Sequence, residues 1–254
     1  MSVGTVLSKY DETPCDELQR RSGAPQVLVI ERCASTMDVA HHLAADGAPH
    51  GAAVVAEEQG AGRGRSGKSW TSTRGAGVWV SVLLRNVVAA PSGVLSLRTG
   101  LELAQSLDTF AAARIRLKWP NDLFVAERKL AGILTEARWH GDLLEWIVVG
   151  IGINVRASQV EPLSASLAPT ARRADVLVAA VSSALRAAEI VGELSADELS
   201  RYADRDLAIG REIDAPVTGT VLGVTSRGGL RVATATGVSV AVSGSLVFRS
   251  PSAE

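Results

Sequence analysis

Short apolar runs alternate with polar or glycine-rich segments through the first two thirds of the chain. Residues 26–30, 52–56 and 78–84 are rich in valine, leucine and isoleucine, and each run is short enough for a strand. Residues 143–155 form the longest apolar run, which predicts a strand buried on both faces. Gly150 and Gly152 interrupt that run, so it holds either a bulge or a place where another group approaches the backbone.

Helical spacing of apolar residues occurs in four places. We expect helices from Ser35 or Thr36 to about residue 46, and over 93–113, 170–192 and 195–208. The last of these begins with Ser195 and has Glu198 three residues later, which predicts a capping box.

Between the second and third of these helices the pattern predicts three short strands. Residues 115–122 read as a strand that Pro120 interrupts, and the Asn-Asp pair after it is typical of a turn. Residues 123–125 and 129–136 predict a hairpin that turns at 126–128.

The last part of the chain has a different texture. From Gly210 onward, short β-rich runs alternate with glycine turns, which predicts a small β-barrel. We therefore expect two domains, 1–208 and 209–254, with the smaller one packed on the larger because so short a chain buries little core alone. The expected strands of this barrel are 211–213, 217–221, 229–232, 238–242 and 246–248.

Composition narrows the class of protein. The 254 residues carry a formal net charge of −1, which argues against a general nucleic-acid binder. The two cysteines lack metal-site spacing, and no signal peptide or long apolar span is visible, so we expect a cytoplasmic protein that binds neither DNA nor membranes. The four histidines form no metal-binding pair, and no metal ligand is predicted from them.

Residues 59–70, QGAGRGRSGKSW, are the most distinctive stretch. The glycines let the backbone approach a ligand closely, and the cations Arg63, Arg65 and Lys68 suit a carboxylate or phosphate. The stretch also matches the phosphate loop of nucleoside triphosphatases and the dinucleotide-binding fingerprint. Both motifs need a helix at the last glycine, whereas the β-branched and glycine-rich residues 70–77 are poor helix formers. We therefore disfavour both.

Further cations accompany that loop. Lys118 and Lys129 lie near strand ends, and Asp122 is close to Lys118 in sequence. No serine–histidine–aspartate order or reactive cysteine context accompanies them. Cations without a protein nucleophile suit phosphoryl or nucleotidyl transfer, in which position and electrostatics do most of the work. A lysine taken alone is in most cases an ordinary solvated surface charge.

Five motifs, in order, resemble those of the biotin protein ligases. They are GRGRSG at 62–67 with Trp70, KWPND at 118–122, KLAGIL at 129–134 and GIGIN at 150–154, preceded by Ser35-Thr36. The resemblance covers about residues 26–250. It implies an α/β (α+β) fold, with a mixed β-sheet flanked by helices like that of class II aminoacyl-tRNA synthetases, followed by a small SH3-like C-terminal β-barrel.

The resemblance also implies a two-step reaction. The carboxylate of biotin attacks the α-phosphate of ATP, supplied with Mg²⁺, to give biotinyl-5′-AMP and pyrophosphate. A lysine of a biotin carboxyl carrier protein domain, part of a biotin-dependent carboxylase, then attacks this mixed anhydride. No protein-held metal site is implied with certainty.

The resemblance carries roles to individual residues. The catalytic set is Lys129, Arg63, Arg65, Lys118 and Asp122. The biotin site adds Ser35, Thr36, Gln59, Gly62, Gly132, Leu134, Gly150 and Gly152. The ATP and adenylate site shares Arg63, Arg65, Lys118 and Lys129, and adds Ser66, Trp70, Asn121 and Asn154.

Three departures qualify the resemblance. Met37 stands where many members carry asparagine, and Ser66 where arginine is common. The chain has no room for the amino-terminal winged helix of repressor-type ligases, so we expect the monofunctional type. The alternatives are a lipoate–protein ligase of the same superfamily, or a binding module that senses biotin or a nucleotide without turnover.

Overall fold

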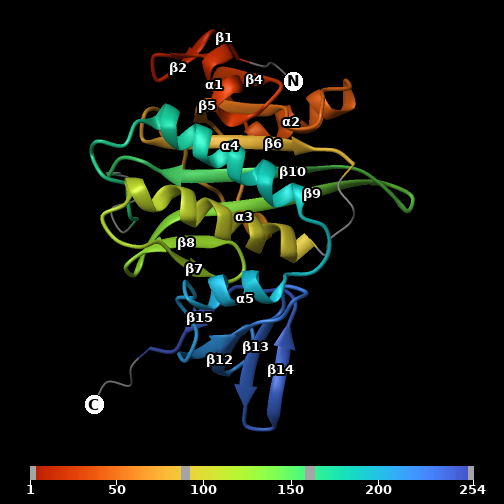
Figure 1. Cartoon of the computed structure of the whole chain (residues 1–254), viewed down its shortest axis with the longest axis vertical. Coiled ribbons are helices and arrows are strands. Elements are labelled where there is room, and N and C mark those ends of the chain that lie inside the picture. The colour runs from red at the N-terminus through yellow and green to blue at the C-terminus, as the bar shows by residue number, and fades with distance from the viewer. Residues whose placement is uncertain (1–3, 87–91, 158–163, 251–254) are drawn as a thin grey trace.

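The computed structural model describes residues 4–86, 92–157 and 164–250, and an eight-stranded sheet forms its centre (Figure 1). In order across the sheet, the strands are β1 (Val6–Leu7), β4 (Val27–Cys33), β5 (Ala53–Gln59), β6 (Gly77–Leu84), β10 (Leu143–Asn154), β9 (Arg128–His140), β8 (Asp122–Val125) and β7 (Arg116–Lys118). Strands β4 and β5 run parallel, and the other neighbouring pairs are antiparallel. The mixed sheet predicted from the sequence is therefore confirmed.

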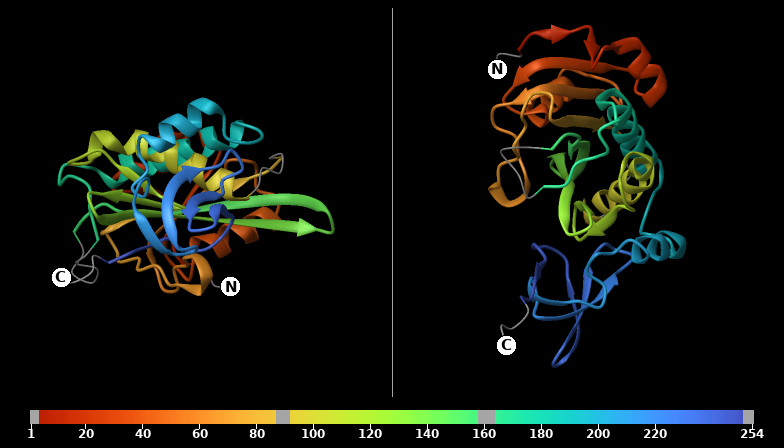
Figure 2. Two further views of the ribbon diagram at one scale, coloured as in Figure 1. Left: turned by 90° about the horizontal axis from the view of Figure 1, so that it is seen from below. Right: turned by 90° about the vertical axis from the view of Figure 1, so that its left-hand side faces the viewer.

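Helices cover both faces of this sheet. Helices α1 (Cys15–Ser22), α3 (Ser92–Leu107) and α4 (Arg173–Glu189) share one core cluster, and α2 (Thr36–Ala45) belongs to a second. The alternation along β5 explains the two clusters, because Val55 contributes to the first and Val54 to the second. Figure 2 shows α3 and α4 together on one side of the strands.

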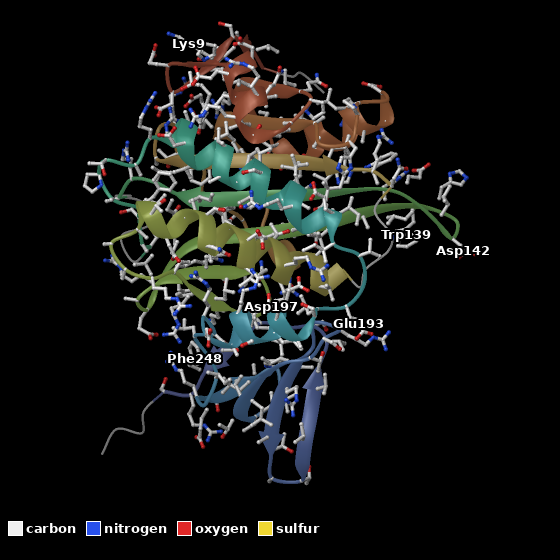
Figure 3. All side chains as sticks on the ribbon, viewed as in Figure 1. Lys9, Trp139, Asp142, Glu193, Asp197 and Phe248 are labelled. Carbon is white, nitrogen blue, oxygen red and sulfur yellow. The ribbon has the colours of Figure 1, made fainter. Side chains whose placement is uncertain are left out.

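The predicted strands of the main domain are all present. The runs 26–30, 52–56 and 78–84 form β4, β5 and β6, and the long run 143–155 forms β10. The predicted hairpin is β8 and β9, which pair antiparallel through a turn at Ala126, where φ is 51°. The next hairpin, β9–β10, projects beyond the sheet, and Trp139 and Asp142 lie near its end (Figure 3).

Three predicted helices end at least three residues earlier than expected. Helix α4, predicted over 170–192, covers only Arg173–Glu189, and α3 and the helix predicted over 195–208 are also shorter at their C-terminal ends. Helix α3 ends at Leu107 and a 3-10 turn follows at Asp108–Phe110, because the Asp108 carboxylate accepts hydrogen bonds from Ile115 N at 2.9 Å and Arg205 Nη2 at 2.6 Å. Helix α5 (Ala196–Ala203) has the predicted capping box but stops before residue 208. The backbone beyond it instead pairs with Leu117, whose N–H donates to Arg205 O at 2.8 Å.

The amino-terminal residues contain elements that the sequence pattern did not predict. Strand β1 adds to the edge of the sheet beside β4, and β2 (Lys9–Tyr10) pairs with β3 (Thr13–Pro14) before α1 begins. Tyr10 is fully buried and its hydroxyl donates to Gly77 O at 3.1 Å. This segment therefore supports the strand that follows the glycine-rich loop.

A second sheet follows α5. Its five strands, in order, are β14 (Gly237–Ala241), β13 (Leu230–Thr234), β12 (Gly219–Val224), β11 (Glu212–Ala215) and β15 (Val247–Phe248). It packs on the main domain as expected: Trp119 Nε1 donates to Gly228 O at 2.9 Å, and one apolar cluster includes residues of both parts. Closure of this sheet into a barrel, and the boundary at 208/209, remain predictions.

Within the described ranges, no helix is both long and apolar enough to cross a membrane.

Candidate functional site

The strongest candidate for a site is a cavity between the glycine-rich loop and strands β6, β9 and β10. Helix α2 contributes its first turn, and the segment between β14 and β15 of the C-terminal domain contributes Ser245. The predicted site residues that line this cavity are Ser35, Thr36, Gln59, Arg63, Arg65, Trp70, Asn121, Asp122, Lys129, Gly132, Leu134, Gly150 and Gly152. Segments that are far apart in sequence thus meet in one place.

The first turn of α2 supplies polar groups to the cavity. Gln59 Oε1 accepts from Thr36 N at 2.8 Å and Thr36 Oγ1 at 3.1 Å, so Gln59 takes over the capping role expected of Ser35 or Thr36. Ser35 occupies the N-cap position without making a side-chain cap bond. Its buried Oγ has no hydrogen-bond partner among the described residues, which leaves this hydroxyl free for a ligand.

Gln59 also ties this turn to the loop. Its Nε2 donates to Ser72 Oγ at 2.7 Å. Since both ends of the amide are already bonded to protein, Gln59 positions α2 and the loop relative to each other in this structure.

Three glycines form the floor of the cavity on β9 and β10. Gly152 is paired with Gly132 across the two strands, and Gly150 with Leu134. A Cβ on Gly152 would lie 2.5 Å from the indole of Trp70, and one on Gly150 would lie 2.5 Å from Met37 Sδ. The space above these glycines is therefore occupied by Trp70 and Met37, and a ligand that reaches the floor must displace or share it.

The charged end of the cavity lies at β8 and β9. Lys129 Nζ is 2.7 Å from Asp122 Oδ1, and it also lies 5.1 Å from the centroid of the Trp70 ring. The pairing of Asp122 with Gly132 brings this carboxylate beside the glycine floor. Lys129 and Asp122 thus form an ion pair that faces the same space as the indole.

The glycine-rich loop forms a small hairpin of its own. Trp70 N donates to Gly62 O at 2.8 Å and Gly64 N to Lys68 O at 2.7 Å, with a 3-10 turn at Arg65–Gly67 between them. A Cβ on Gly62 would lie 2.4 Å from Trp70 O, so the close approach of these two backbones requires glycine there. The next regular element is β6, and no helix starts at Gly67. The phosphate-loop and dinucleotide interpretations were rightly disfavoured.

The two arginines of the loop have different surroundings. Arg65 Nη1 donates to Gly244 O at 3.3 Å and to Asn121 Oδ1 at 3.5 Å, and burial lowers the pKa of its guanidinium. Both acceptors are uncharged, so neither of these hydrogen bonds neutralises the positive charge of Arg65. Arg63 instead contacts Asp38 at 2.7 Å and Glu136 at 3.0 Å.

Four predicted site residues lie outside the cavity lining. Gly62 supports Trp70, and Ser66 is exposed at the tip of the loop with φ of 55°. Asn154 ends β10 opposite Gly77. Lys118 Nζ lies 5.5 Å from the Phe124 ring centroid and 5.0 Å from that of Phe248, and burial lowers its pKa. Their ligand roles remain predictions.

The structure adds residues that sequence reasoning missed. Ile133 and Ile151 line the cavity beside the floor glycines, and Ser245 reaches it from the segment between β14 and β15. Both isoleucines lie inside motifs identified in the sequence, Ile133 in KLAGIL at 129–134 and Ile151 in GIGIN at 150–154. Their position in these motifs was the signal that could have placed them at the cavity. Nothing near Ser245 in sequence marks it, because only the packing of the two sheets brings it to the cavity.

Comparison with known proteins accounts for this set of residues. Residues 29–154 match the sequence profile of the Biotin/lipoate A/B protein ligase family. That range contains every predicted site residue, including the loop, the Lys129 motif and the floor glycines.

Residues 29–154 belong to this family.

Individual relatives agree with the family. The Bifunctional ligase/repressor BirA of Bacillus subtilis is 40% identical over 122 residues, which are 48% of this chain and 38% of that protein. The Biotin--[acetyl-CoA-carboxylase] ligase of Mycobacterium tuberculosis is 39% identical over 155 residues, 58% of this chain and 56% of that protein. The matched region thus spans about half or less of these relatives' length.

The likeness to solved structures extends over more of the chain. The biotin protein ligase of Aquifex aeolicus, solved in complex with biotin and ATP, has a TM-score of 0.71 and 25% identity, and the alignment covers 89% of this chain and 99% of that one. The family fold therefore includes most of the architecture described above.

Proposed function

We propose that the chain is an ATP-dependent biotin protein ligase. It activates biotin as biotinyl-5′-AMP with release of pyrophosphate, and then transfers biotin to a lysine of a carrier domain. The observation that carries this proposal is the arrangement of the cavity, with the unpartnered Ser35 hydroxyl at one part and the cations Arg65 and Lys129 at another. Membership of the family and the likeness to ligases named for biotin support it.

The lining of the cavity suits the three chemical parts of biotin. The Ser35 and Thr36 hydroxyls offer hydrogen bonds to an uncharged polar ring, and such bonds discriminate against analogues that lack its polar atoms. Met37, Trp79 and Leu134 provide an apolar wall for an aliphatic chain. Lys129 and Arg65 provide positive charge for a carboxylate and the phosphate it attacks.

Activation needs stabilisation of charge more than it needs a protein nucleophile. The biotin carboxylate is itself the nucleophile toward the α-phosphorus, and pyrophosphate leaves. Negative charge builds on the phosphoryl oxygens, where Lys129 and Arg65 stabilise it in a partly buried site. Trp70 then lies over the adenylate and limits the access of water to the mixed anhydride.

Transfer requires a neutral amine on the acceptor lysine. Asp122 is the carboxylate that we assign to orient this amine, since among the described cavity residues it is the only acid. The amine adds to the activated carbonyl, AMP leaves and an amide bond forms. Lys118 stands next to this end of the cavity and, in this proposal, contacts the phosphates when nucleotide is bound.

The magnesium ion enters with the nucleotide in this account. Mg²⁺ is commonly held by one or two carboxylates together with substrate phosphates. Asp122 fits such a donor set, with the carbonyl oxygen of the Asn121 amide beside it. The ion supplies charge neutralisation on the phosphates, and the chain's residues supply position.

The proposed acceptors are carboxyl carrier domains of biotin-dependent carboxylases, and the proposed location is the cytoplasm. The test combines purified protein, MgATP, a purified carrier domain and either biotin or lipoate, with acceptor mass as the readout. The account expects a mass increase with biotin and none with lipoate. A carrier whose target lysine is replaced by arginine is the control.

The same assay distinguishes the alternatives. Modification by lipoate instead of biotin would assign the chain to the other branch of the family. Tight biotin binding without adenylate or modified carrier would identify a binding module. Either result would overturn the proposal.

A further inference from the structure

Arg63, which lines the cavity, is also the end of a chain of contacts whose other members lie outside the lining. Its Nη1 lies 2.7 Å from Asp38 Oδ1 on α2, and its Nη2 donates to Glu136 Oε2 on β9 at 3.0 Å. The same Glu136 oxygen lies 3.1 Å from Nε2 of His41. His41 Nδ1 is in turn 2.9 Å from Nε1 of Trp146 on β10. Three elements of the domain thereby converge on one guanidinium of the loop.

We propose that Asp38 and Glu136 clamp Arg63, and with it the base of the loop, against α2 and β9, and that His41 is the positioning residue for Glu136. The guanidinium presents a planar fork, and here its two terminal nitrogens face two different carboxylates. The charges are only partly exposed, with side-chain exposure of 38% for Arg63 and 23% for Asp38. Solvent therefore screens this pair less than a fully exposed one.

The hydrogen-bond pattern fixes the tautomer of His41. An indole N–H can only donate, so Nδ1 of His41 must accept from Trp146. The ring proton then resides on Nε2 and points to Glu136. This bond from His41 and the charge of Arg63 hold the pKa of Glu136 below its ordinary value. Glu136 thus stays ionised and oriented toward the loop.

The clamp divides the work of the two loop arginines. Arg63 uses both terminal nitrogens to hold the loop, at the position where it forms a bridge with Ser69 across the small hairpin. Arg65, two residues further along, donates to two uncharged acceptors among the described residues, Asn121 Oδ1 and Gly244 O. We therefore assign Arg63 to anchoring and leave Arg65 as the loop arginine that meets the anionic ligand.

The effect of this clamp on catalysis rests on the proposed function, because a loosened loop would expose the adenylate. The existence of the clamp does not rest on the proposed function, since its contacts are present without a ligand. Its test therefore uses proteolysis of the ligand-free protein. Trypsin cleavage after Arg65 and Lys68 reports how often the loop opens, provided that opening and closing are fast relative to cleavage.

The decisive variant is Glu136→Gln, which removes the charge but keeps the size of the side chain. The matched control is Glu145→Gln on the neighbouring strand β10, where the carboxylate is 3.9 Å from Arg138 and from His140, and forms no ion pair with the described residues of the loop. We expect Glu136→Gln to raise the initial cleavage rate after Arg65 and Lys68 about three- to fivefold, as loss of a half-exposed ion pair would. Glu145→Gln should leave it unchanged.

His41 is tested by rescue. His41→Ala removes the donor to Glu136 and should raise loop cleavage, whereas the amide of His41→Gln can donate to Glu136 and accept from Trp146, and should restore the wild-type rate. A merely space-filling role for His41 predicts no difference between these variants once both are folded.

Some outcomes overturn the clamp. Wild-type cleavage in Glu136→Gln and in a second variant, Asp38→Asn, would do so. So would a rise that is equal at tryptic sites outside the loop, because that pattern means general unfolding. If the clamp fails while wild-type protein still forms adenylate, the proposed function stands. If loop cleavage rises as expected while no variant and no wild-type protein uses biotin, the proposed function fails and the clamp stands.

Discussion

The indole of Trp70 lies directly on the backbone of Gly152. A Cβ at residue 152 would be 2.5 Å from Cε2 and 2.6 Å from Nε1 of that ring. The buried Nε1 has no hydrogen-bond partner among the described residues. In this structure, Trp70 therefore fills part of the space to which we assign the ligand, and the glycine is what allows it to do so.

This contact predicts opposite outcomes for two neighbouring glycines. In Gly152→Ala the new methyl group meets a rigid ring, so we expect a loss of stability of about 1–3 kcal/mol and an altered Trp70 environment. In Gly150→Ala it meets Met37 Sδ, at 2.5 Å, and the flexible thioether can move, so the loss should be smaller. Urea unfolding followed by tryptophan fluorescence measures both. A larger loss for Gly150→Ala would contradict this interpretation.

A buried ion pair joins α3 to α5. Arg98 and Glu198 are 1% and 4% exposed, and Arg98 Nη2 donates to Glu198 Oε2 at 3.2 Å. Glu198→Gln leaves the buried guanidinium without its counter-charge, so we expect a loss of about 3–5 kcal/mol in the free energy of unfolding.

The neighbouring residue provides the control for this prediction. Asp197 lies on the same helix, is 76% exposed and pairs with Arg201. Asp197→Asn should change the free energy of unfolding by no more than about 0.5 kcal/mol. Equal losses in the two variants, measured by urea unfolding, would contradict a special role for burial.

Asp206 predicts a pH-dependent stability of unusual sign. Burial raises the pKa of this carboxyl to about 6, with Arg116 opposing the shift and Ala208 N donating to Oδ1 at 2.8 Å. The folded state then keeps a proton that the unfolded state releases above about pH 4. The contribution of this group to stability is full below that pH and is lost as pH rises to about 6.

Asp206→Asn removes this titration and nearly keeps the shape. We expect its stability relative to wild type to improve by roughly 2–3 kcal/mol between about pH 4 and pH 8, since one pKa unit corresponds to about 1.4 kcal/mol. Urea unfolding of both proteins at the two pH values measures the difference. A constant difference would show that Asp206 does not titrate in this range.

Much of the fold was predictable because its signals are local. The apolar composition of the sequence segments that form β4, β5, β6 and β10 directly indicates the burial of these strands. The capping box depends only on Ser195 and Glu198, which lie within four consecutive residues. By contrast, strands of two residues such as β1 have no periodicity to detect, and the early end of α3 depends on Asp108 reaching Arg205.

The site divides in the same way. The loop, the Lys129 motif and the floor glycines are contiguous motifs, and the structure brings them to one cavity. Asp38, His41 and Glu136 gave no signal as a group, because they lie on two elements and only tertiary packing joins them to Arg63. Ser245 depends on the docking of the second sheet. Long-range contacts of this kind leave no pattern in a single segment.

The ion pair between Lys129 and Asp122 predicts the effect of removing the ammonium. Lys129→Ala should lower biotin-dependent adenylate formation by about 10²–10³-fold, which is typical for loss of one charge-stabilising contact in a closed site. Folding should change little, because the lysine is 38% exposed. Lys9→Ala is the control, since that lysine is 57% exposed, forms its ion pair with Glu12 among the described residues and lies at the far end of the domain (Figure 3).

The most direct test of the proposed activity is exchange of labelled pyrophosphate into ATP, measured with and without biotin. Reversible formation of biotinyl-5′-AMP requires this exchange, and binding alone cannot produce it. We predict exchange that depends on biotin in the wild-type protein and in Lys9→Ala, and that falls at least about a hundredfold in Lys129→Ala. No exchange above the biotin-free rate in folded wild-type protein, or undiminished exchange in Lys129→Ala, would contradict it.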